Sequence, residues 1–178
     1  MQRREVVRYL AAAFALPFLP QSAEAAIDLG ERLNRRLADD DVEFRTLDAA
    51  QRATVTDIAE MIIPATNTPG ATAVRVPEFI DLILTEWMSD GERTAFLAGL
   101  SEIEAKGFAT MSRAQKTDLL TTLDGARADK AGAGHTFGRL KALTVYGYFT
   151  SARVERDVLK MQMFFDGYHG NVPFTPAT

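Results

Sequence analysis

An all-α fold is the class that this sequence predicts. Apolar residues recur at helical spacing in several stretches, and most of these begin at a capping residue and end near glycine or proline. No stretch shows convincing strict alternation of apolar and polar residues, so no strand is predicted, and no internal repeat is present. We therefore expect a single helical domain of about five to seven helices, with long loops and an extended C-terminal tail.

Length and composition exclude several classes of protein. The chain of 178 residues is long enough for one domain with its own core. A net charge of -4 without a clustered basic face argues against a nucleic-acid-binding protein. The absence of cysteine excludes disulfides, thiolate metal sites and covalent haem attachment on this chain.

Residues 1–25 have the features of an export signal. A basic start precedes an apolar run too short to span a bilayer comfortably, and cleavage is expected after Ala25 in the Ala23-Glu24-Ala25 segment. The adjacent Arg3 and Arg4 resemble the twin-arginine signal, which carries folded proteins. We expect a periplasmic protein without a membrane span after signal removal. An amphipathic core helix is the alternative interpretation.

Residues 26–46 form a charged N-terminal arm that precedes the helical domain and C-terminal tail of residues 47–178. Leu29, Leu33 and Leu37 recur every four residues, so a short helix is one interpretation. A partly ordered arm that lies on another surface is the preferred one.

Six helices are predicted in the domain, most of them from their caps. Asp48 with Gln51, Ser89 with Glu92 and Ser112 with Gln115 resemble capping boxes, and Pro77 suits a first helical position. A further helix is expected to be apolar around most of its circumference, and therefore central. The predicted helices run from Asp48 to before Pro64, from Pro77 to Trp87, from Ser89 to Gly107, from Ser112 to just before Gly125, from the Thr136 cap over Phe137 to about Tyr148, and from the Ser151 cap to Leu159.

The segment between Pro64 and Pro77 is predicted to be a built loop, because the two prolines mark the end of one helix and the start of the next. Within it, Asn67, Thr68 and Pro69 are open to two interpretations, an ordered turn or a contact with a partner protein. Pro64 belongs to the same candidate interface.

Two aromatic groups are also candidate interface residues. Tyr146, Tyr148 and Phe149 form either the end of a core helix or part of an interface, where tyrosine and phenylalanine are favoured anchors. In the tail, the candidates are Phe164, Phe165, Tyr168 and His169.

No catalytic, cofactor-binding or metal-ligating residues are predicted. The sequence contains no dinucleotide fingerprint after a strand, no phosphate loop, no nucleophile elbow and no H-E-x-x-H. With only His135 and His169, a histidine metal site would need carboxylates, and no spacing indicates one. A chain of this kind is better suited to binding another protein than to chemistry.

The motifs IIPATNTPGA, VPEFID, FATMSRAQKTDLL and LKALTVYGYFTS, in this order between about Leu47 and Tyr168, resemble the gluconate 2-dehydrogenase subunit 3 family. The resemblance implies the small subunit of an exported, flavin-dependent sugar or polyol dehydrogenase. It implies a large glucose-methanol-choline type partner that holds FAD, and often a c-type cytochrome with haem c. The small subunit then carries the twin-arginine signal and assists maturation of its partner. The family offers no catalytic residues to assign here.

The expected function is therefore that of an accessory subunit, part of an oxidoreductase complex but not catalytic alone. One alternative is that Tyr168 or His169 completes the partner's substrate pocket. A second is a stand-alone periplasmic helical module that binds a small ligand, although an aromatic tail left bare on a monomer argues against it.

Overall fold

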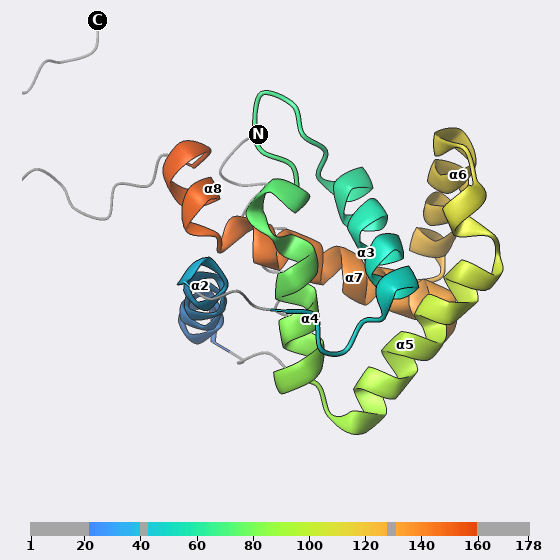
Figure 1. Ribbon diagram of the computed structural model, residues 1–178, viewed down its shortest axis with the longest axis horizontal. Coiled ribbons are helices and arrows are strands. Elements are labelled where there is room, and N and C mark those ends of the chain that lie inside the picture. The colour runs from blue at the N-terminus through green and yellow to red at the C-terminus, as the bar shows by residue number, and fades with distance from the viewer. Residues whose placement is uncertain (1–21, 40–42, 128–130, 160–178) are drawn as a thin grey trace, which may run out of the picture.

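The computed structural model describes residues 22–39, 43–127 and 131–159 (Figure 1). Within these ranges the chain forms seven α-helices and two short 3-10 helices, without a β-strand, so the all-α prediction is confirmed. None of the described helices is both long and apolar enough to cross a bilayer. The elements are α2 (Ala23–Asp39), α3 (Ala49–Ile62), η1 (Thr72–Val74), α4 (Val76–Glu86), α5 (Asp90–Ala105), η2 (Phe108–Thr110), α6 (Arg113–Gly125), α7 (Gly132–Phe149) and α8 (Ala152–Asp157).

The predicted caps set most of the helix starts. Capping boxes open α3, α5 and α6, where a side-chain oxygen of Asp48, Ser89 or Ser112 accepts a hydrogen bond from the backbone N–H three residues on. Pro77 lies in the first turn of α4, and Ser151 caps α8. These interactions are local in the chain, which is why the sequence pattern predicts them correctly.

Helix α7 is the centre of the core, as its apolar circumference predicted. It contacts each of α2, α3, α4, α5, α6 and α8, and in Figure 1 it lies across the middle of the molecule behind α3 and α4. The approach of α4 is close, because a Cβ atom on Gly147 would lie 2.6 Å from Cδ1 of the Phe79 ring. The cost of a glycine inside this helix is thus offset by packing.

The start of α7 differs from the prediction. Thr136 was expected to cap the helix, but α7 begins four residues earlier, at Gly132. Thr136 is fully buried and its hydroxyl donates to the Phe96 carbonyl at 3.4 Å. The first turn is supported instead by Glu102 on α5, whose carboxylate accepts from the Ala133 N–H at 2.8 Å. Gly125, expected just past the end of α6, is its last residue.

The preferred interpretation of the charged arm was also wrong, since residues 23–39 form helix α2 and pack on the domain. Leu29, Leu33 and Leu37 are buried in the common core. Asn34 donates from Nδ2 to the Gly147 carbonyl at 3.2 Å and to the Thr150 hydroxyl at 2.9 Å. The alternative interpretation, a helix with leucines every four residues, describes this segment.

Glu155 gives the contact between α2 and α8 a dependence on pH. Burial, together with the nearby Glu31 carboxylate and against the opposing effect of Arg35, raises the pKa of Glu155 to about 7. The Glu155 carboxyl therefore binds its proton more tightly in the folded state than in the unfolded chain, where its pKa is 4.5. The free energy of unfolding should fall as the pH rises from 4.5 to about 7. We expect Glu155→Gln to unfold at a higher temperature than the parent at pH 8 and at a similar temperature at pH 4, as measured by scanning calorimetry. An equal difference at both pH values would contradict this.

Candidate docking surface

The loop between α3 and α4, residues 63–75, which we call the α3–α4 loop, is a surface segment fixed by hydrogen bonds to several helices. It extends from the body of the protein at the top of Figure 1, between α3 and α4. Pro64 and Asn67 are exposed, whereas Thr68 and Pro69 are partly buried. The loop closes on itself through a hydrogen bond from the Ala71 N–H to the Ile63 carbonyl at 2.9 Å.

Glu60, in the last turn of α3, holds both ends of this loop. Its carboxylate accepts from the Ala65 N–H at 2.9 Å, the Thr72 N–H at 3.1 Å and the Thr72 hydroxyl at 2.8 Å. Burial raises the pKa of Glu60, but the hydrogen bonds from Thr72 and Ala65 outweigh it and hold the pKa below the usual glutamate value. The Glu60 carboxylate, which we call the clamp of the loop, is therefore charged at neutral pH, and its hydrogen bonds to the loop weaken as the pH falls through the lowered pKa.

The other side of the loop is held by the C-terminal part of the chain. The Tyr148 hydroxyl donates to the Pro69 carbonyl at 2.8 Å, and Arg153 donates to the Ala73 carbonyl at 3.3 Å. Burial raises the pKa of Tyr148, so the phenol remains a donor. At the end of the loop, Arg75 has a φ of +59° and its guanidinium donates to the Leu37 carbonyl of α2. The exposed turn is thus held by hydrogen bonds with α3, α7 and α8.

Replacing Glu60 with Ala should loosen the α3–α4 loop without unfolding the domain. Three hydrogen bonds to a charged acceptor are lost, and because they are exposed to solvent their combined contribution is about 1.5 kcal/mol. We expect amide hydrogen exchange at Ala65 and Thr72 to accelerate by about tenfold or more, while exchange in the core of α7 is unchanged. Thr72→Val, which keeps the backbone bond, is the milder control. Unchanged exchange at both amides in Glu60→Ala would contradict the clamp.

The sequence-predicted interface residues fall into three groups. Pro64, Asn67, Thr68 and Pro69 do lie on the loop, in an ordered turn where the Thr66 N–H donates to the Thr68 carbonyl at 3.0 Å; whether they also contact a partner stays a prediction. A second group, Phe164, Phe165, Tyr168 and His169, lies outside the described residues, as do the predicted signal residues Arg3 and Arg4.

The third group is buried in the structure. Tyr146 is fully buried, and Tyr148 and Phe149 retain 3% and 4% of their exposure. Tyr146 stacks edge-on against Phe79, and Tyr148 likewise against Phe149. The end of a core helix, one of the two interpretations, therefore describes these aromatics. Of the three, only Tyr148 bears on the loop, through the Pro69 carbonyl.

The predicted cleavage segment lies at the start of α2. Ala23 and Ala25 belong to its first turn, where the Ala25 N–H donates to the Ser22 hydroxyl at 3.2 Å. The next residue, Ala26, is fully buried, and its carbonyl accepts from the Tyr146 hydroxyl. Cleavage after Ala25 stays a prediction.

Sequence reasoning missed a groove along α3, which we call the α3 groove. One hollow of about 310 Å³ lies between α3, α5 and η2, and a shallower one of about 680 Å³ lies between α3 and the α3–α4 loop. They share Ala53 and Asp57, so the groove continues from Glu104 to Thr72. In the sequence, this groove could have been indicated only by the small residues Ala49, Ala50 and Ala53 of α3. The sequence does not show which residues lie opposite these alanines.

Among residues 22–39, 43–127 and 131–159, no cluster of His, Asp and Glu side chains is arranged to hold a metal ion. His135, in the first turn of α7, is partly buried and makes an interaction there. What the described surface offers is a rigid loop and an adjoining groove, which are features of a helical protein-binding domain.

The family of the chain agrees with this class of protein. The family model for gluconate 2-dehydrogenase subunit 3 matches residues 49–167, which is more than half of the 178 residues. The chain therefore belongs to the gluconate 2-dehydrogenase subunit 3 family, whose members are subunits of a multi-subunit dehydrogenase complex. No curated protein and no solved structure matches it significantly.

Proposed function

We propose that this chain is the accessory, non-catalytic subunit of a periplasmic, FAD-dependent sugar or polyol dehydrogenase. It binds the large flavoprotein subunit, of the glucose-methanol-choline type, and stabilises it during maturation. The observation that carries the proposal is the α3–α4 loop, an exposed turn tied down by Glu60, Tyr148 and Arg153. A loop ordered before binding loses little conformational entropy when a partner covers it.

Membership of a family of dehydrogenase subunits supports a protein partner rather than a free small ligand. FAD belongs to the partner in this proposal, and haem c to a third, cytochrome subunit where one is present. Electron transfer then takes place entirely outside this chain, whose contribution is binding energy and export.

Export is the second part of the proposal. Arg3 and Arg4 supply the twin-arginine signal for both subunits, and the flavoprotein crosses the membrane bound to this chain. Such a passage requires a complex that survives transport, so the interface should bury on the order of 2,000 Å². The loop would form one part of it and the C-terminal tail another.

The test is co-expression of the proposed large flavoprotein subunit with and without this chain. We expect the flavoprotein to lose periplasmic yield and FAD content when this chain is absent, and to lose export alone when Arg3 and Arg4 are both replaced by Lys. Equal yield, FAD content and export with and without the chain would overturn the proposal. So would a purified, solitary preparation of this chain that oxidises a sugar or retains flavin.

The tail separates two forms of the proposal. If Tyr168 or His169 completes the partner's substrate pocket, Tyr168→Ala and His169→Ala should lower turnover in an intact complex. We expect these substitutions to weaken assembly instead, with turnover per assembled complex unchanged.

A further inference from the structure

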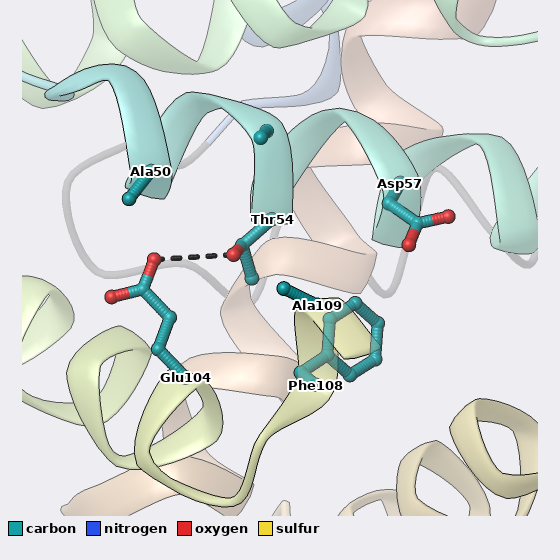
Figure 2. A pocket seen from close by; sticks show the side chains of 7 residues that line it. Ala50, Thr54, Asp57, Glu104, Phe108 and Ala109 are labelled. Atoms are coloured by element: carbon teal, nitrogen blue, oxygen red, sulfur yellow. Dashed lines mark hydrogen bonds between the residues drawn. The ribbon is translucent and has the colours of Figure 1, made fainter. Parts of the chain in front are cut away.

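The hollow between α3 and α5 combines apolar walls with two carboxylates, those of Asp57 and Glu104. Figure 2 shows Glu104 reaching from α5 toward Thr54 on α3, with Phe108 and Ala109 beside them. The Thr54 hydroxyl donates to Oε1 of Glu104 at 3.1 Å. Thr54 retains only 5% of its exposure, so this wall of the hollow is firmly placed.

Glu104 differs from Asp57 in its partners. No salt bridge to it is formed by a lysine or arginine of the described residues, and its hydrogen bond comes from the neutral Thr54 hydroxyl. Asp57, at the other end of the hollow, differs, because Nζ of Lys116 lies 2.5 Å from its Oδ2. A carboxylate in the position of Glu104, beside apolar surface, favours a cation with an aliphatic stem.

Two cations close to the α3 groove, Lys116 and Arg52, make contacts with other residues. Nζ of Lys116 also lies 5.0 Å from the centroid of the Phe108 ring. The guanidinium of Arg52 lies over the Phe44 ring at 4.9 Å. Either side chain would have to give up its ring contact to turn toward Glu104.

The rest of the lining suits the stem of a long basic side chain. Ala50, Ala53 and Ala109 leave open space where larger residues would close it, and Phe108 forms an apolar floor. The volume of about 310 Å³ lies at the low end for small-molecule sites and admits one side chain rather than a large ligand. The hollow joins the groove that runs to Thr72 on the α3–α4 loop.

We propose that this hollow receives one basic side chain, arginine or lysine, of the protein that docks on the α3–α4 loop. The guanidinium or ammonium donates to the Glu104 carboxylate while its methylene stem lies on Ala50, Ala53 and Phe108. The identity of that protein rests on the function proposed above, but the site itself does not. Desolvated pairs of this kind act as hot spots in the centre of an interface.

The test uses the full chain, labelled with ¹⁵N, and n-butylguanidinium as a probe for an arginine side chain. We expect amide chemical-shift changes at Thr54, Glu104 and Ala109 that saturate with probe concentration. Neutral n-butylurea, of similar shape, should bind at least about fivefold more weakly, and Glu104→Gln should weaken the probe about tenfold. Asp118→Asn, which removes one exposed carboxylate from α6, is the matched control and should leave binding unchanged.

Three results would overturn the proposal: no localised shifts with the probe at tens of millimolar, equal binding of n-butylurea, or unchanged binding in Glu104→Gln. Ala53→Leu provides a second check, because it fills the hollow without changing charge and should abolish the shifts. Since this experiment needs only the solitary chain, its failure leaves the co-expression result standing. A co-expression failure with saturable, Glu104-dependent binding would remove the accessory role and keep the site.

Discussion

Tyr146→Ala is expected to lower the free energy of unfolding by about 4 kcal/mol, the largest effect of any single substitution considered for this protein. The side chain is fully buried at the end of α7, edge-on to Phe79 with ring centroids 5.4 Å apart. Its hydroxyl also donates to the Ala26 carbonyl of α2. The substitution therefore leaves a cavity and removes one of the contacts that hold α2 on the domain. Urea unfolding followed by circular dichroism measures the loss.

Tyr146→Phe separates the two contributions. It keeps the ring against Phe79 and removes only the hydroxyl, so we expect a loss of about 1 kcal/mol. If both variants lose the same amount, the packing of the ring contributes little and the account of the α7 core is wrong.

Asp81→Ala is expected to lower the free energy of unfolding by about 3 kcal/mol. Asp81 on α4 is buried, with a relative exposure of 2%, and its carboxylate accepts three backbone hydrogen bonds. The donors are the N–H groups of Arg45 at 2.8 Å, Thr46 at 3.0 Å and Leu47 at 2.7 Å. Without the carboxylate these donors lose their acceptor, and the segment that leads into α3 is released from α4.

The measurement is again urea unfolding, together with hydrogen exchange at Thr46 and Leu47, which should accelerate in Asp81→Ala. Asp118→Ala, an exposed position on α6, is the control and should change stability little. A loss in Asp81→Ala no larger than in this control would contradict the role of the carboxylate.

The helix boundaries that sequence reasoning predicted well are those set by neighbours in the chain. The boxes of Asp48 with Gln51, Ser89 with Glu92 and Ser112 with Gln115 all form, because each is made by residues three apart. The start of α7 was missed because its support comes from Glu102, on another helix. Glycine-rich residues 132–134 have low helix propensity, and only packing against α5 overrides it.

In the candidate interface, too, local features were predicted from the sequence and long-range contacts were not. Proline spacing located the α3–α4 loop, but its three anchors lie on α3, α7 and α8 and were not visible as a set. Composition alone does not distinguish buried from exposed aromatics, so Tyr146, Tyr148 and Phe149 were open to two interpretations, a core-helix end or an interface, and only the fold shows that all three are buried.

The sequence by itself determined the helical class, the capped starts of α3, α5 and α6, and the family of the chain, because these depend on local spacing and on motif order. Only the tertiary structure decided that the charged arm is a packed helix, which tyrosines are buried, and that Glu104 faces Thr54 across a groove. The physical reason is that burial and long-range hydrogen bonds arise from how the helices pack around α7, and a pattern along one helix does not specify what lies opposite it.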